Sequence, residues 1–105
     1  MVQTPTVYVP NRSAHVFEAA KRYGALRFVT EGRVNRFDTS EMWRAWDEAL
    51  QDSSPDDYII ITSLNILCSI GSALFGSRHG KLNLLLYRNG VYIHREIWLD
   101  DRGPN

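Results

Sequence analysis

The chain has 105 residues, 44% of them hydrophobic and 23% charged, and its twelve basic residues balance its twelve acidic ones. This composition is that of a globular protein, so it excludes a disordered chain, and the length predicts a single domain over residues 1–105. With no net charge, the chain has no overall field that would attract nucleic acid or an anionic membrane. Any anion-binding site must therefore be local.

The cysteine content and the apolar segments predict the compartment. Cys68 is the one cysteine, which excludes a disulfide within the chain and a metal site built from several cysteines. The first residues lack the basic and apolar regions of a signal peptide, and Asn65 with nearby small polar residues interrupts the most apolar stretch. We expect a cytoplasmic protein that does not associate with membranes.

The beginning of the chain predicts two strands with a helix between them. Residues 6–9 form a β-branched and aromatic run that Pro10 stops, and residues 25–30 form a second run of this kind. Between the two runs, residues 11–13 offer N-cap chemistry for an amphipathic helix over residues 14–23.

A second helix is predicted from Asp38 to about Gln51. The spacing from Asp38 to Glu41 matches a capping box, in which the first residue accepts a hydrogen bond from the backbone of the second. The apolar positions of this helix recur at helical spacing and include Trp43 and Trp46. We expect both tryptophans to pack on the sheet.

The middle of the chain predicts the centre of the fold. Residues 58–61 are a β-branched run without polar alternation, which is typical of a strand covered on both faces. Residues 64–78 are apolar on nearly every side and predict a deeply buried helix, in which Gly71 indicates a close approach to a neighbour.

Two final strands, over residues 82–88 and 91–99, are joined by Asn89-Gly90, the strongest short signal for a type I′ hairpin. The element order is therefore β-α-β-α-β-α-β-β, and helical crossovers of this kind make parallel sheets. We predict a single α/β domain with a mostly parallel sheet and an antiparallel C-terminal hairpin. Residues 1–5 and 100–105 are expected to be frayed ends.

The loops that follow the first three strands hold a set of polar and basic side chains. In open α/β sheets, ligands bind beyond the carboxyl ends of the strands, so these side chains are predicted to form one polar rim. Helix N-termini attract anions, and two of the serines are expected to cap helices beside arginines. The residues predicted to bind a ligand are Asn11, Arg12, Ser13, Arg33, Asn35, Arg36, Ser63 and Asn65.

Recognised catalytic and cofactor motifs are missing from the chain. It has neither the phosphate-binding loop G-x-x-x-x-G-K-[ST] nor the dinucleotide motif G-x-G-x-x-G. The histidines His15, His79 and His94 lack metal-ligand spacing. Cys68 lies in an apolar stretch that is typical of the core, and Ser63 lacks the glycines of a nucleophile elbow. We therefore predict no catalytic residue, no metal and no cofactor.

The first functional interpretation is a non-enzymatic binding or assembly module that recognises an anionic, phosphate-bearing ligand or partner at the polar rim. A nucleotide, a nucleic-acid backbone and an acidic protein surface all remain open as partners, and so does a homo-oligomer. The arginine-rich composition without a catalytic signature is similar to that of many small reading frames of phages and mobile elements, which would make the chain an accessory protein.

Two alternatives stay open. The chain could be a protein-interaction or oligomerisation subunit that uses the last strand, where Tyr92, His94 and Trp98 share one face. It could also be a small α/β enzyme of unknown reaction that uses Ser63, His15 or Asn65, because a fold does not determine a function.

Overall fold

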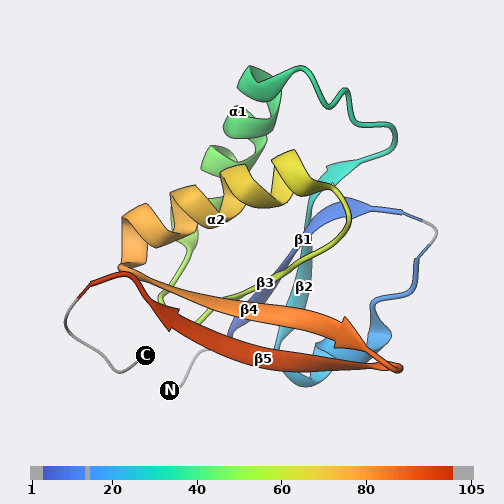
Figure 1. Cartoon of the computed structure of the whole chain (residues 1–105), viewed down its shortest axis with the longest axis vertical. Coiled ribbons are helices and arrows are strands. Elements are labelled where there is room, and N and C mark those ends of the chain that lie inside the picture. Colours follow the sequence, from blue (N-terminus) through green and yellow to red (C-terminus); the bar gives the residue numbers. More distant parts are fainter. Residues whose placement is uncertain (1–3, 14, 101–105) are drawn as a thin grey trace.

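The computed structural model describes residues 4–13 and 15–100 (Figure 1). Two α-helices, two short 3-10 helices and five strands follow one another in this part of the chain. In chain order they are β1 (Thr6–Arg12), η1 (Glu18–Arg22), β2 (Ala25–Glu31), α1 (Thr39–Ala49), η2 (Leu50–Asp52), β3 (Tyr58–Ile60), α2 (Asn65–His79), β4 (Lys81–Arg88) and β5 (Val91–Trp98).

The described strands form one sheet in the order β2-β1-β3-β4-β5. The neighbours from β2 to β4 pair in parallel, and β5 pairs antiparallel with β4. The predicted α/β class, with a mostly parallel sheet and an antiparallel C-terminal hairpin, is confirmed, and β3 is the central strand. From β1 the chain moves to β2 on one side and then to β3 on the other. The direction of winding therefore reverses between β1 and β3.

The hairpin has the predicted geometry. Arg88 pairs with Val91, so two residues make the turn. Both carry positive φ angles, 50° at Asn89 and 86° at Gly90, as a type I′ turn requires.

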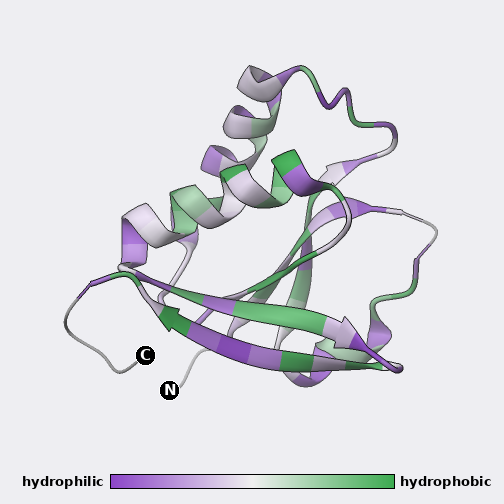
Figure 2. Ribbon diagram, viewed as in Figure 1, coloured by the Kyte–Doolittle hydropathy of each residue, from purple (hydrophilic) through white to green (hydrophobic). Residues whose placement is uncertain are grey.

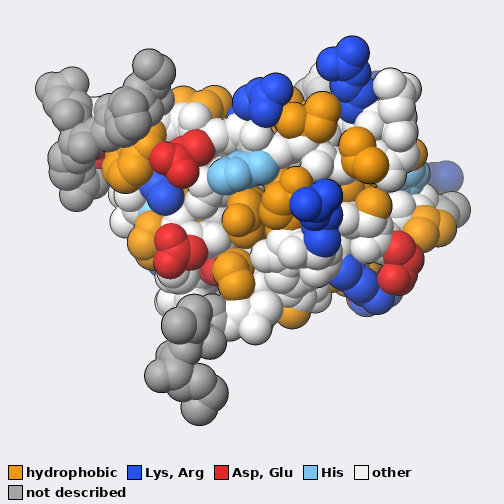
Figure 3. All heavy atoms as spheres, turned by 90° about the horizontal axis from the view of Figure 1, so that it is seen from below, with side chains coloured by type: hydrophobic (Ala, Val, Ile, Leu, Met, Phe, Trp, Pro, Cys, Tyr) orange, Lys and Arg blue, Asp and Glu red, His pale blue; other side chains and the backbone are white. Residues whose placement is uncertain are grey.

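The sheet separates two hydrophobic clusters. Alternate residues of a strand point to opposite faces, so Tyr8 packs under α1 and α2 while Val7 and Val9 pack under η1. We call these the helical face and the opposite face. Both α-helices cover the helical face (Figure 1), because the two crossovers that contain them run in the same direction across the sheet. Only the short η1 covers the opposite face, and hydrophobic side chains remain visible there among Lys and Arg (Figure 3).

The predicted helix over residues 14–23 is wrong in its described part. Only Glu18–Arg22 is helical, as a 3-10 helix whose N-cap position is Phe17. Ser13 therefore caps no α-helix, and its hydroxyl accepts instead from the backbone N–H of His15 at 3.2 Å. Residue 14 lies outside the described residues. Ser13 directly follows β1, which runs further than predicted.

Strand β1 continues through Pro10 to Arg12, although we predicted that Pro10 would stop it. The residues on either side, Val9 and Asn11, stay in register with β2. The carbonyl of Pro10 accepts from the hydroxyl of Thr30 at 2.7 Å, which ties the proline to β2. The predicted fraying at the start is also wrong for Pro5, whose carbonyl accepts from the backbone of Ala25 at 3.1 Å. Residues 1–3 and 101–105 of the predicted frayed ends lie outside the described residues.

Helix α1 begins as predicted. The side chain of Asp38 accepts from the backbone N–H of Glu41 at 3.1 Å. Trp46 is fully buried, and its Nε1 donates to the carbonyl of Leu67 in α2 at 2.9 Å. The expectation that Trp43 also packs on the sheet is wrong, because Trp43 is 48% exposed. Trp43 precedes Trp46 by three residues, which is less than one helical turn, so the two side chains point in different directions from the helix axis. Trp43 therefore lies at the outer edge of the apolar stripe.

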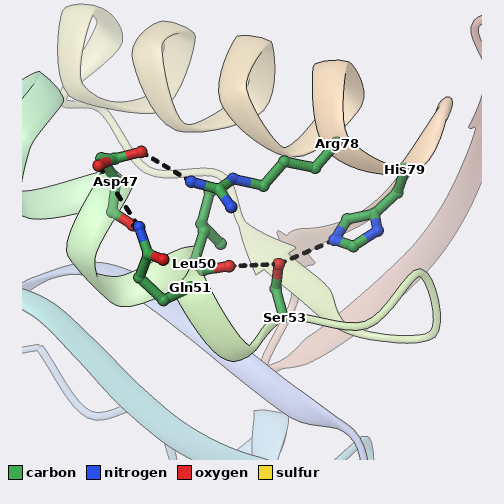
Figure 4. A network of polar contacts seen from close by, with 6 residues as sticks. All are labelled: Asp47, Leu50, Gln51, Ser53, Arg78 and His79. Carbon is green, nitrogen blue, oxygen red and sulfur yellow. Dashed lines mark hydrogen bonds and ion pairs between the residues drawn. The ribbon is translucent and has the colours of Figure 1, made fainter.

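Polar contacts join the C-terminal ends of α1 and α2 (Figure 4). Arg78 and Asp47 form an ion pair at 2.7 Å, and the hydroxyl of Ser53 donates to the carbonyl of Leu50 at 2.7 Å. The same hydroxyl oxygen lies 2.8 Å from Nε2 of His79. Because the serine proton is already used, Nε2 of His79 must carry a proton and donate. Burial lowers the pKa of His79 below its ordinary value, although Asp57 opposes this shift.

Gly71 of α2 lies against the indole ring of Trp46. A Cβ atom at this position would overlap the ring. We expect Gly71→Ala to lower the free energy of unfolding by about 2 kcal/mol, because a filled core has no space for the methyl group. Ser77→Ala, on the exposed side of the same helix, should change it by less than about 0.5 kcal/mol. Urea unfolding measures both, and equal stability of the two variants would contradict this packing.

The lowered pKa of His79 makes the stability depend on pH. An unfolded histidine has a pKa of about 6.5, so below this pH the unfolded chain takes up a proton that the folded protein resists. The free energy of unfolding should be highest above pH of about 6.5 and should fall as the pH drops towards the lower folded pKa. His79→Gln keeps an N–H donor and does not titrate, so its stability should fall less over this window. Thermal unfolding at several pH values measures this. If the stability of both proteins changes with pH in the same way, His79 is not the group responsible.

Candidate binding cleft

A cleft of about 630 Å³ opens at the carboxyl ends of β1 and β3. The winding of the sheet reverses at this point, so we call this hollow the switch-point cleft. Crevices at such points are the usual ligand sites of open α/β sheets. The wall comes from the end of β1, from the connection after it, from the loop between β3 and α2, and from the hairpin. The residues are Asn11, Ser13, His15, Phe17, residues 60–64, Leu86, Tyr87 and Tyr92.

The loop between β3 and α2 forms the floor and is held by local hydrogen bonds. Thr62 Oγ1 accepts from the backbone N–H of Leu64 at 3.2 Å. The backbone N–H of Thr62 donates to Sγ of Cys68 at 3.3 Å, and this sulfur also contacts the Thr62 carbonyl at 3.7 Å. Cys68 is 6% exposed, as expected of a core cysteine. Ser63 does not cap α2, because the N-cap position is Leu64. The side chain of Ser63 lines the cleft instead.

Aromatic rings form one side of the cleft. His15 lies edge to face against Phe17 and Tyr87, with ring centroids 5.0 and 5.5 Å apart. Tyr87 lies 5.3 Å from Tyr92 in the same kind of contact. Burial, and secondly the neighbouring Tyr87, raises the pKa of Tyr92, so this phenol is neutral at physiological pH. Tyr87 is 52% exposed and therefore accessible to a ligand, whereas Phe17 and Tyr92 are buried.

The cleft is almost free of charge. Among the described residues that line it, His15 is the one histidine, and none is Lys, Arg, Asp or Glu. Hydroxyl and amide groups supply donors and acceptors beside aliphatic and aromatic surface. Such a lining suits an uncharged ring or aliphatic group that is oriented by a few hydrogen bonds.

Three predicted site residues, Asn11, Ser13 and Ser63, lie at this cleft. The amide of Asn11 is already bound on both ends. It donates to the carbonyl of Gly32 at 3.1 Å, and its Oδ1 lies 3.0 Å from the hydroxyl oxygen of Thr30, whose one proton it shares with the nearer carbonyl of Pro10. Asn11 therefore joins the ends of β1 and β2 and shapes the rim.

The predicted arginines lie elsewhere. Arg12 pairs with Glu31 at 3.0 Å and lies over the ring of Phe28 at 3.8 Å, because the parallel register places Arg12 and Glu31 side by side. Arg33 and Asn35 line a separate hollow that also contains three carboxylate residues. The predicted rim is thus divided among several surfaces.

Arg36 and Asn65 line a third hollow, of about 280 Å³, together with Ser63. This hollow shares Ser63 and Leu64 with the cleft, so the two adjoin. Arg12 also lines a hollow that adjoins the cleft, through Ser13, His15 and Phe17, but its guanidinium is already paired with Glu31.

Sequence reasoning missed the aromatic part of the cleft. Tyr87 ends a strand that is parallel to β1 and β3, so its carboxyl end meets the same edge of the sheet. The strand order would have brought Leu86 and Tyr87 into the candidate site, but β4 was read only as part of a hairpin. Within the described residues, no group of three His, Cys, Asp or Glu side chains is placed to hold a metal.

We expect Thr62→Val to loosen the floor of the cleft. Valine has nearly the same shape but offers no acceptor to the N–H of Leu64, and a lost hydrogen bond of this kind costs about 1 kcal/mol. Hydrogen exchange at the Leu64 amide should therefore become several times faster. Thr39→Val, at the exposed start of α1, is the control and should leave that amide unchanged. Unaltered exchange in Thr62→Val would show that the hydroxyl does not hold the loop.

Comparison with known proteins shows the family of the chain. No curated protein and no solved structure matches the chain. Within the part that the structure describes, no helix has the length and apolar character needed to cross a membrane. A family model described as phage Pam3 gp32-like protein matches residues 5–99, which include every described helix and strand. This agrees with the phage resemblance inferred from the sequence. The chain belongs to the family of phage Pam3 gp32-like proteins.

Proposed function

We propose that the chain is a non-enzymatic binding or assembly module that receives a group of its partner in the switch-point cleft. The observation that supports this most is the position of the cleft at the reversal between β1 and β3, together with its uncharged lining. The free cysteine, Cys68, supports a place in the cytoplasm.

The lining favours an uncharged ring as the group that enters. The exposed ring of Tyr87 offers one stacking surface, and the edge of His15 closes the same side. Ser63 also lines the cleft, and its hydroxyl supplies a donor and an acceptor that would orient a polar atom on the ring. Ring contacts of this kind add to the gain from apolar burial.

The adjoining hollow is the best candidate to bind the anionic group of the predicted ligand. Arg36 lies there with Asn65, and Ser63 separates this hollow from the cleft. A ligand that carries both a ring and a phosphate or carboxylate would span the two. A nucleotide meets this description, as does a nucleic acid through a base and its backbone phosphate, and an acidic protein surface that presents an aromatic ring beside a carboxylate.

An enzyme is the weaker alternative. Ser63 and His15 both line the cleft, but none of its described lining residues is a carboxylate that would orient the imidazole. Asn65 lies in the adjoining hollow and not in the cleft. Binding without chemistry accounts for the same residues and requires no further group.

The test is a titration of ¹⁵N-labelled protein with indole, adenine, AMP and inorganic phosphate, followed by amide chemical shifts. The three ring compounds should shift the amides of Thr62, Ser63 and Tyr87. AMP should also shift Asn65 and bind more tightly than adenine. Tyr87→Ala should weaken adenine binding by at least about fivefold, because the accessible stacking surface is lost.

Trp43→Ala is the matched control, since it removes an exposed aromatic side chain outside the cleft. Arg36→Ala should abolish the preference for AMP over adenine and leave adenine binding unchanged. If no ring compound shifts the cleft amides, or if Tyr87→Ala binds as the unmodified protein does, the cleft is not the binding site. Phosphate shifts centred on Arg12 or Arg33 would contradict the anionic part.

A further inference from the structure

The two α-helices leave the outer part of the helical face uncovered. Helix α2 packs above β3 and β4, while β5 lies beyond it at the edge of the sheet (Figure 1). Along β5, a hydrophilic stretch lies between hydrophobic residues on either side (Figure 2). On the helical face, Val91 is 51% exposed and Ile97 is 39% exposed. The other face of β5 is better covered, and Tyr92 is only 3% exposed there.

We call this surface the hairpin face and define it by Arg88, Val91, Ile93, Arg95, Ile97 and Leu99. These residues share one side of the hairpin because Arg88 pairs with Val91 and because alternate positions of β5 point the same way. Leu99 is 54% exposed and reaches Gly76 of α2, where a Cβ would overlap it. On α2, Ser69 and Ala73 lie seven and three residues before Gly76, so they share its side of the helix, and both are exposed. Their small side chains allow another helix to approach closely.

The charges on the hairpin face have one sign. Arg88 and Arg95 are both exposed, and neither forms an ion pair with a carboxylate of the described residues. Other arginines, such as Arg12 and Arg78, are paired. A partner that covers this surface must bring its own carboxylates. A symmetric pair of hairpin faces from two copies would place arginines against arginines, which disfavours self-association through this surface.

The backbone edge of β5 is partly occupied, which disfavours the addition of a strand. In a two-residue hairpin that closes at Arg88 and Val91, the carbonyls of Tyr92 and His94 point away from β4. The first accepts from the hydroxyl of Tyr23 at 2.9 Å, and the second accepts from the guanidinium of Arg95 at 2.9 Å. A strand at this edge would have to displace both donors. The exposed face is free, so a helix fits better than a strand.

We propose that the hairpin face docks a helix of another protein chain, laid beside α2, whose apolar side covers Val91 and Ile97 and whose carboxylates pair with Arg88 and Arg95. Val91 and Ile97 lie about 20 Å apart along an antiparallel strand. A helix of about 13 residues spans this length. The docked helix would complete the helical layer over the edge of the sheet.

The probes are two designed amphipathic helical peptides of about 18 residues, long enough to be partly helical alone. Both carry the same Leu and Ala face, flanked by Glu in one and by Lys in the other. The Glu peptide should shift the amides of Val91, Ile93 and Ile97 and those of Ser69 and Ala73 on α2. The Lys peptide should bind at least about tenfold more weakly, because it faces two arginines.

The variant Arg88→Glu, Arg95→Glu reverses the charge of the surface. It should bind the Glu peptide about tenfold more weakly and should now prefer the Lys peptide. Both positions are exposed, so the fold should be kept. Unchanged amide chemical shifts at residues far from the two substitutions would verify this. Arg44→Glu on the exposed side of α1 is the matched control and should leave both affinities unchanged.

Several results would overturn the proposal. The Glu peptide could fail to bind at millimolar concentration, both peptides could bind equally, or the shifts could centre on Thr62 and Tyr87 in the cleft. Concentration-dependent shifts of the hairpin-face amides without peptide would show that a second copy covers the surface. Tyr87→Ala should leave peptide binding intact, so failure of the hairpin face and failure of the cleft give separate outcomes.

Discussion

The contact between Trp46 and Gly71 is the constraint on which the helical layer depends. The indole of Trp46 is fully buried between the two α-helices, and the missing side chain at Gly71 makes room for it. The indole N–H donates to the carbonyl of Leu67, so the ring also fixes the first turns of α2 along its axis. Cys68 lies in those turns, and its sulfur accepts a hydrogen bond from the backbone N–H of Thr62 in the cleft floor. The position of the cleft floor therefore depends on how Trp46 is packed.

Local signals predicted the elements whose ends are determined by their own residues. The Asn89-Gly90 turn and the Asp38 cap each need only a short segment, and both have the expected geometry. The prediction of a helix over residues 14–23 was wrong, because an amphipathic pattern does not show that the residues before the helix belong to a strand. Strand β1 takes residues as far as Arg12 into the ladder with β2, which leaves a connection in which only η1 is helical.

The candidate site was harder to predict than the fold, because it depends on strand order and on side-chain direction. The rule for carboxyl ends pointed to the edge of the sheet where the cleft opens, and Asn11, Ser13 and Ser63 line this cleft. It did not reveal that the register would place Arg12 beside Glu31. Nor did it indicate that β4 would bring Tyr87 to the same edge, since that requires knowing which strand lies next to β3.

The cleft and the hairpin face have one physical origin, which is a shortage of helices. Five strands expose two faces, and the described chain covers them with α1, α2 and two short 3-10 helices. On the opposite face, η1 packs through Phe17 and Ala20 and does not extend over the carboxyl ends of β3 and β4, where the cleft opens. On the helical face, α2 does not extend over β5, so Val91 and Ile97 stay exposed. A chain of this length buries enough surface to fold but leaves apolar area at both places. Exposed apolar surface of this kind is typical of sites that contact a partner or a ligand.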